Sequence, residues 1–282
     1  YLGLGQAMEK IGMAHDLQGV RHYQTKGMIV PLKRGRHMLE KYGAYQFQVH
    51  RADIHDILIE NLEKHSPGCI FVDHQLVGID QKSDKVKLMF NNQAEHEFDF
   101  VILATQADVA QKILSARADT EQSKLLNNIP MQSSTMVLHT DTDLVYDQQQ
   151  ASPVSYIVDK KLSRPATSVD LSKAFSTYAQ QAPVFQTWNI IKAPQPGTVI
   201  NSSDFTRPLV TLNSRESVAQ LLEINKSSRI KICGSYMANK IPLLDAAVES
   251  SVKLARQLDC DIPWDKTEQP ADENYDAPAL AY

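Results

Sequence analysis

Residues 229–234, Arg-Ile-Lys-Ile-Cys-Gly, decide the fold, because they predict a short strand that runs directly into a turn. Residues 245–258 follow with apolar side chains at the spacing of one helical face, which predicts a helix. At the turn, Gly234 lacks a side chain, so the backbone there can pass directly against a ligand. The first amides of the helix, around Ala246, have no partners within the helix and can face an electron-rich oxygen.

A second strand is predicted from residues 98–105, Phe-Asp-Phe-Val-Ile-Leu-Ala-Thr, an almost wholly apolar run that stops at small polar residues. Such a run is typical of a strand buried on both faces of a parallel sheet, and residues 107–114 follow it with a helical pattern. Cofactors bind at the carboxyl edge of such sheets, because the loops diverge there and leave a crevice. The alternative is a simple strand-to-helix turn capped by Thr105 or Gln106.

The rest of the chain shows two kinds of sequence pattern. Its first part mixes helical and strand patterns, with helices predicted at residues 6–12 and 49–63 and strands at residues 69–72, 75–80 and 85–90. Beyond Pro130 short alternating segments predict an antiparallel sheet in a second domain. Its strands are expected at residues 134–139, 154–158, 168–171 and 184–190.

Composition excludes several classes of partner. The chain has 282 residues, of which 43% are hydrophobic and 22% charged, an ordinary mixture for an enzyme with a buried core. Its formal net charge of −4 provides no broad basic field, so nucleic acid is not an expected partner. No apolar run approaches the roughly 20 residues that span a bilayer, and residues 1–4 do not resemble a signal peptide. We therefore expect no membrane span.

The cysteines and histidines predict neither a disulfide nor a metal site. Cys69, Cys233 and Cys260 are odd in number and widely spaced, so we expect reduced core thiols and a cytoplasmic location. His50 and His55 fall on different helical faces, and no carboxylate-rich set completes a metal-ligand shell.

Several of these stretches resemble known flavoproteins. Residues 245–255, Asp-Ala-Ala-Val-Glu-Ser-Ser-Val-Lys-Leu-Ala, resemble the Gly-Ala-Val-Glu-Ser-Gly helix motif of the flavin amine oxidase superfamily. Residues 98–108 and 137–142 are similar to predicted bacterial NAD/FAD-binding oxidoreductases of that superfamily. Nearer the start, residues 40–45 and 49–55 resemble salicylate hydroxylase-like FAD monooxygenases.

The resemblance implies an α/β fold in which a Rossmann-like, glutathione-reductase-like FAD domain carries an inserted mixed or antiparallel-sheet substrate domain. The expected division is residues 1–128 for the first part of the FAD domain, 129–226 for the substrate domain and 227–266 for the return to the FAD domain. Residues 267–282 are rich in Asp, Glu, Pro and Ala and lack periodicity, so we expect a mobile tail.

The resemblance also implies contacts with the cofactor FAD. Arg51 corresponds to a position near the ribityl-pyrophosphate, although a surface or helix-capping arginine is the alternative. The remaining expected FAD contacts are Leu76 at the adenine, Ala104 and Thr105 at a strand end, Gly234 and Ser235 at the ribityl turn, and Ala247 and Val248 beneath the isoalloxazine. Amine oxidases hold their substrate between aromatic residues, so the substrate candidates are Tyr156, Trp188 and Tyr236, each with a core-packing alternative.

The sequence departs from the flavoprotein pattern at two places. Residues 3–8, Gly-Leu-Gly-Gln-Ala-Met, lack the third glycine and the preceding strand of a pyrophosphate-binding loop, so we expect the FAD domain to be incomplete at its N-terminus. Residues 106–108, Gln-Ala-Asp, replace the Asp-Gly motif of the hydroxylases, which argues against ring hydroxylation with a nicotinamide donor.

The predicted function is FAD-dependent oxidation or reduction of a small organic substrate, by amine-oxidase-like or monooxygenase-like chemistry. One alternative is a non-catalytic flavoprotein remnant that serves as a binding or scaffold protein, and another is a truncated form of a complete flavoenzyme. The substrate, electron acceptor, catalytic base and oligomeric state do not follow from the sequence.

Overall fold

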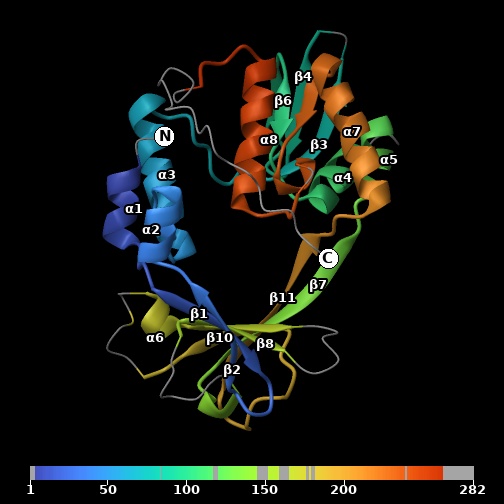
Figure 1. The fold of residues 1–282 in the computed structure, drawn as a ribbon. Coiled ribbons are helices and arrows are strands. Elements are labelled where there is room, and N and C mark those ends of the chain that lie inside the picture. Colours follow the sequence, from blue (N-terminus) through green and yellow to red (C-terminus); the bar gives the residue numbers. More distant parts are fainter. Residues whose placement is uncertain are drawn as a thin grey trace. The chain divides into compact units, whose positions relative to one another are not determined.

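The computed structural model describes residues 4–82, 84–116, 120–144, 152–158, 165–175, 178, 182–238 and 240–262 (Figure 1). Contacts between residues divide the chain into two compact units. Residues 76–129 and 210–262 belong to what we call the Gly234 unit, and residues 4–75 and 130–209 belong to the sheet unit. The tail expected to be mobile, residues 267–282, lies outside the described residues.

The Gly234 unit contains a parallel pair of strands and an antiparallel meander, with helices packed around them (Figure 1). β12 pairs with β6 in parallel, and β3, β4 and β5 pair in that order as the meander. The elements are, in chain order, β3 (Leu76–Gln81), β4 (Val86–Phe90), β5 (Glu95–Phe98), β6 (Val101–Leu103), α4 (Ala107–Ser115), α5 (Glu121–Asn127), α7 (Leu212–Ser227), β12 (Ile230–Ile232), the 3-10 helix η4 (Ser235–Met237) and α8 (Leu244–Gln257).

Side-chain amides cover the edge of β12 that faces away from β6. The Asn225 side chain, on α7, donates through Nδ2 to the carbonyl of Ile232 (2.7 Å) and accepts at Oδ1 from the amide of Ile232 (2.9 Å). On α5, Gln122 Nε2 donates to the carbonyl of Ile230 (2.8 Å). Both amide side chains are buried, so they satisfy backbone groups that would otherwise be buried without partners.

The sheet unit is built on a seven-stranded sheet in the order β11-β7-β10-β9-β8-β1-β2. Its strands pair antiparallel except β1 and β8, which are parallel. The elements are, in chain order, α1 (Gly5–Ile11), β1 (Leu17–His22), β2 (Met28–Lys33), α2 (Arg36–Tyr42), α3 (Arg51–His65), β7 (Met131–His139), the 3-10 helix η1 (Thr142–Leu144), β8 (Val154–Val158), β9 (Ala166–Asp170), α6 (Leu171–Ala174), β10 (Phe185–Trp188) and β11 (Val199–Pro208).

The two faces of this sheet differ in burial. Tyr156 pairs with Thr167, which pairs in turn with Trp188, so these side chains form a row across β8, β9 and β10. All three are half-buried, and the Trp188 ring packs against Phe205 with centroids 5.2 Å apart. Neighbouring positions along the same strands, including Thr187, point to the opposite face and are buried.

Two strand predictions were wrong. Residues 69–72 form no strand, and Phe71 is 74% exposed, because no neighbouring strand pairs with this run among the described residues. The run at residues 98–105 is split between the end of β5 and β6, and Ile102 is exposed, so this strand is not buried on both faces. Burial on both faces requires a sheet continuing on each side, and in the described residues β6 pairs only with β12.

The predicted helices are confirmed, whereas the prediction for the cysteines is only partly right. Helices occur at residues 5–11, 51–65, 107–115 and 244–257, as the apolar periodicity indicates. All three cysteines are unpaired, but only Cys233 is buried, so the prediction of core thiols was wrong for Cys69 and Cys260. No helix within the described residues combines the length and the apolar character needed to cross a bilayer.

The contact grouping differs from the expected domain division. Residues 4–75 group with residues 130–209, because β1 pairs with β8 and thereby joins the central sheet of that unit. The expected boundary of the substrate domain was residue 226, but the sheet unit ends at Leu209. The reason is that α7 packs against α5 and β12 and therefore belongs to the Gly234 unit.

Acidification is expected to destabilise the sheet unit. Burial lowers the pKa of His139 and of His15 below the ordinary value of 6.5, so both stay neutral in the folded chain while the unfolded chain binds protons. The free energy of unfolding is therefore retained above pH 6.5 and falls as the pH drops below it. Thermal unfolding between pH 7.5 and 5 measures this slope. His139→Gln should reduce it, whereas the exposed His55→Gln should not; equal slopes in all three proteins contradict the prediction.

Candidate functional site

The parallel pairing of β6 and β12 places two turns side by side. Ile232 lies beside Leu103 in the register, and the amide of Cys233 donates to the carbonyl of Leu103 (3.1 Å). A side chain added at Gly234 would place its Cβ 3.5 Å from the carbonyl oxygen of Thr105. The Gly234 turn and the strand end at Thr105, which the sequence indicated separately, therefore adjoin each other. This is the carboxyl edge at which ligands bind in open α/β sheets.

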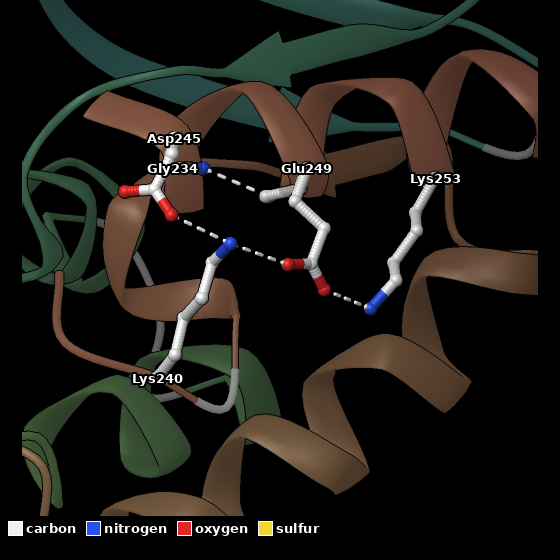
Figure 2. A network of polar contacts seen from close by, with 6 residues as sticks. Gly234, Lys240, Asp245, Glu249 and Lys253 are labelled. Atoms are coloured by element: carbon white, nitrogen blue, oxygen red, sulfur yellow. Dashed lines mark hydrogen bonds and ion pairs between the residues drawn. The ribbon is translucent and has the colours of Figure 1, made fainter. Parts of the chain in front are cut away.

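Gly234 occupies a backbone conformation that favours glycine. Its φ of 150° lies in a region that L-residues rarely adopt, and an added Cβ would lie 2.9 Å from Cε1 of the Tyr236 ring. The amide of Gly234 donates to Ser250 Oγ on α8 (3.1 Å), a bond drawn in Figure 2. The turn is therefore fixed to α8, and the Tyr236 ring and the Thr105 carbonyl occupy the space that a side chain at position 234 would need.

The N-terminal end of α8 is exposed and apolar. The N-cap residue Leu243 provides no side-chain hydrogen bond to the helix, and the Asp245 carboxylate accepts from the backbone amides of Asp245 and Ala246. Leu244 is 71% exposed, and Ile241, Leu243 and Val248 are also exposed. The exposed apolar side chains at this helix start suit a flat, largely apolar group.

A chain of ion pairs surrounds this helix start (Figure 2). Lys240 Nζ lies 2.7 Å from Asp245 Oδ2 and 2.9 Å from Glu249 Oε2, and Lys253 Nζ lies 2.5 Å from Glu249 Oε1. The hydrogen bond from Lys240 lowers the pKa of Asp245, and those from Lys253 and Lys240 lower the pKa of Glu249. Lys240 thus ties the segment before α8 to its first two turns, although exposed pairs of this kind add little stability.

Tyr236 lies beneath the Gly234 turn and is only 6% exposed. Its hydroxyl is buried and has no hydrogen-bond partner among the residues that the structure describes, and burial raises the pKa of this phenol well above its usual value. In this position the ring packs against the turn and is not open to a substrate.

Tyr236→Phe is expected to leave the free energy of unfolding unchanged or to raise it by about 1 kcal/mol, because an unsatisfied buried hydroxyl costs stability. Chemical denaturation measures the change. Tyr156→Phe, at a half-buried position of the sheet unit, serves as the comparison. A loss above about 1 kcal/mol for Tyr236→Phe alone would show that this hydroxyl has a partner.

The structure brings together six of the expected cofactor residues. Ala104 is exposed and Thr105 half-buried at the end of β6, and the other four lie in the adjoining turn and helix start: Gly234, Ser235, Ala247 and Val248. Leu76, half-buried at the start of β3, belongs to the same unit.

The other expected site residues lie in the sheet unit. Arg51 is the first residue of α3 and is exposed, while Tyr156 and Trp188 are half-buried on β8 and β10. Within the described residues no group of three or more His, Cys, Asp or Glu side chains could hold a metal ion.

Sequence reasoning missed the residues that support the turn, namely Asn225, Lys240 and Ser250. An asparagine inside an otherwise regular helix is an available signal, because Asn favours caps and turns over helix interiors. The other two carry no local signal, since their partners lie 5 to 16 residues away along the chain and are set by the packing of α8.

The family of this chain follows from its similarity to known proteins. Residues 53–223, more than half of the chain, match the profile of the flavin containing amine oxidoreductases. The chain belongs to this family. The flavin amine oxidase resemblance inferred from the sequence is thereby confirmed, and so is a flavin as the family's cofactor.

A curated relative extends the comparison to the monooxygenases. The chain is 28% identical over 102 residues to 6-hydroxynicotinate 3-monooxygenase from Pseudomonas fluorescens, a match that covers 36% of this chain and 26% of that protein. The chain therefore spans about a quarter of this relative's length, within which the monooxygenase resemblance is also confirmed.

Two solved structures share the fold. HpxO from Klebsiella pneumoniae, complexed with FAD and uric acid, has a TM-score of 0.53 at 12% identity, over 91% of this chain and 69% of that one. The p-nitrophenol 4-monooxygenase PnpA from Pseudomonas putida DLL-E4 has a TM-score of 0.52 at 12% identity, over 91% of this chain and 68% of that one. At this identity the likeness concerns the fold alone, a mixed α/β architecture.

Proposed function

We propose that this chain forms part of an FAD-dependent oxidoreductase that acts on a small organic substrate. The flavin would be held where the Gly234 turn, the end of β6 and the first turn of α8 meet, in a Rossmann-like FAD unit. The observation that carries the proposal is the juxtaposition of Gly234, at φ 150°, with the carbonyl of Thr105 and the exposed apolar start of α8. Membership of a flavin-containing family supports the choice of ligand.

The residues at this place fit a flavin. Glycine at position 234 lets the turn lie close to Thr105 and Tyr236, which a Cβ would contact, and the ribityl chain would lie against its backbone. The exposed side chains of Leu244 and Val248 offer an apolar surface for a ring system. Beside them, the positive end of the α8 dipole would face a carbonyl oxygen of the ring.

In the reaction, bound FAD supplies the two-electron acceptor or donor. The chain's own contribution is binding and orientation. The positive end of the α8 dipole would orient the ring at its carbonyl and favour negative charge there. Leu243, Leu244 and Val248 would exclude water from one side. Lys240 would keep the segment before α8 in place through Asp245 and Glu249.

The remaining assignments follow from the resemblance. Arg51 would neutralise the pyrophosphate as an exposed cation at the start of α3, and Leu76 would meet the adenine through its backbone. Tyr156 and Trp188 share a face of the central sheet through Thr167, so they would contact the substrate as an aromatic row. The charge reversal Arg51→Glu would then weaken FAD retention.

Amine-oxidase-like oxidation is the first candidate reaction, because the family is that of the amine oxidoreductases and the hydroxylase Asp-Gly motif is replaced by Gln106-Ala107-Asp108. Monooxygenase-like chemistry is the second, supported by the 6-hydroxynicotinate 3-monooxygenase match. Under anaerobic conditions the two differ. A primary or secondary amine would bleach the flavin directly in the first case, and a reduced nicotinamide would bleach it in the second.

The absorbance of the purified chain tests the proposal. The proposal predicts a yellow protein with a flavin band near 450 nm that releases FAD on heating, or an apoprotein that acquires this band when FAD is added. A chain that stays colourless and does not bind added FAD would favour a non-catalytic scaffold and would overturn the proposal.

A further inference from the structure

A second possible binding site lies wholly within the sheet unit. A cavity of about 740 Å³ opens where β8, β9 and β10 meet the turn between β1 and β2, strands that Figure 1 shows in one sheet. Cavities of this size hold small organic molecules. The cavity shares no residue with the turn at Gly234, so what it binds does not depend on the proposed flavin function.

About half of the cavity wall is apolar. Ile157 and Ala166 come from neighbouring positions of β8 and β9, and Leu144, Ile190 and Ile191 line it from the flanking segments. Such a lining favours an organic body of aromatic or aliphatic carbon over an inorganic ion.

One polar group is fixed in this lining. Thr187 lines the cavity, and its Oγ1 lies 2.8 Å from His139 Nε2 and 2.8 Å from Ser168 Oγ. All three side chains are buried, and burial lowers the pKa of His139, which keeps the network neutral near pH 7. The cavity therefore contains a held hydroxyl without a buried charge.

The charges at the cavity are predominantly positive. Lys26 and Lys192 line it, and neither ammonium group has an ion-pair partner within the described part of the chain. The one carboxylate in the lining, Asp143, already accepts a hydrogen bond from Gln195 Nε2 (3.0 Å). The two ammonium groups are therefore available to pair with an anionic group of a ligand.

The position of Lys26 is set by the core of the unit. Its backbone has a φ of 57°, uncommon for a residue other than glycine. The amide of Lys26 donates to the carbonyl of His22 (2.8 Å), and its carbonyl accepts from the fully buried Arg21 guanidinium (3.1 Å). A buried arginine that anchors a surface turn holds this lysine at the cavity more firmly than an ordinary hairpin would.

We propose that this cavity binds a small organic anion, a carboxylate on an apolar ring or chain. The carboxylate lies between Lys26 and Lys192, and the apolar body rests on Ile157, Ala166 and Ile191. Two partly solvated ion pairs contribute modestly each, so removal of both is expected to weaken binding by about tenfold.

The experiment uses 2-naphthoate, titrated into the full chain and followed by isothermal calorimetry. The wild type should bind, and the neutral analogue 2-naphthamide should bind at least tenfold more weakly. Lys26→Gln with Lys192→Gln should weaken 2-naphthoate binding by about tenfold, whereas Lys33→Gln, an exposed lysine of β2 outside the lining, should not.

A second pair of variants tests the location. Ile191→Glu places a carboxylate in the lining at a partly exposed position and should abolish binding, while Ile200→Glu, exposed on β11, should leave it intact. Equal 2-naphthoate binding by all four variants, equal affinity for 2-naphthamide, or no binding at millimolar concentration overturns the proposal. Measurement on flavin-loaded and flavin-free protein should give the same result, so failure here leaves the flavin proposal untouched.

Discussion

Gly234→Val is expected to reduce flavin retention at least tenfold. Valine at φ 150° is strained at a cost of about 1–3 kcal/mol, and its Cβ would lie 2.9 Å from the Tyr236 ring and 3.5 Å from the Thr105 carbonyl. The side chain would also cover the backbone that we propose faces the ribityl chain. The ratio of absorbance at 450 nm to that at 280 nm in the purified protein measures the loss.

Gly197→Val is the matched control for this prediction. Gly197 has a φ of 83°, and an added Cβ there would meet no atom within 4 Å. The control therefore carries backbone strain without touching the proposed site and should keep its flavin. Circular dichroism checks that both variants fold. Wild-type flavin content in a folded Gly234→Val protein would remove the Gly234 turn from the site.

Asn225→Leu is expected to lower the free energy of unfolding by about 2–4 kcal/mol. The side chain serves both backbone groups of Ile232, at 2.7 and 2.9 Å, and leucine would leave them buried without partners. Lys231 Nζ also donates to the backbone carbonyl of Asn225 (2.5 Å), and burial lowers the pKa of this lysine. Loss of the Asn225 side-chain amide therefore removes the hydrogen-bond partners of the β12 backbone, which leads into Gly234.

Chemical denaturation measures this effect, with Gln220→Leu on the exposed face of the same helix as the control. The control should change stability by less than about 0.5 kcal/mol. A stability loss no larger than that of Gln220→Leu would mean that β12 does not need the amide.

The parts of the fold that could be predicted from sequence are those with a local apolar signal. The strand at residues 230–232 and the helix at 244–257 follow directly from apolar spacing, and the need for glycine at position 234 follows from the sharp turn between them. β11, at residues 199–208, could not be predicted, because its central Asn-Ser-Ser-Asp run is polar and mostly exposed. Pairing with β7 makes it a strand.

The failed strand predictions have different physical causes. Residues 69–72, Cys-Ile-Phe-Val, have strong β-propensity, but propensity makes a strand only where a neighbour is available for pairing, and none pairs with them in the described residues. β1 was missed for the opposite reason, since its buried side chains include the polar Gln18 and Arg21, which hide the alternation.

The sequence pointed to the backbone segments of the candidate site, but not to the side chains that hold these segments in place. Gly234 and Thr105 end their strands at the same sheet edge, which a parallel arrangement requires. Asn225, Ser250 and Lys240 act through contacts that only the packed structure creates, so no local pattern marks them.

Hydrogen–deuterium exchange with and without FAD tests the central claim most directly, because it reports which backbone amides the ligand covers or stabilises. The account predicts slower exchange in residues 101–105 and 233–248 when FAD is added, and unchanged exchange in β9 and β10. FAD binding that leaves both segments unprotected, or that protects only the sheet unit, would contradict a flavin held between the Gly234 turn and α8.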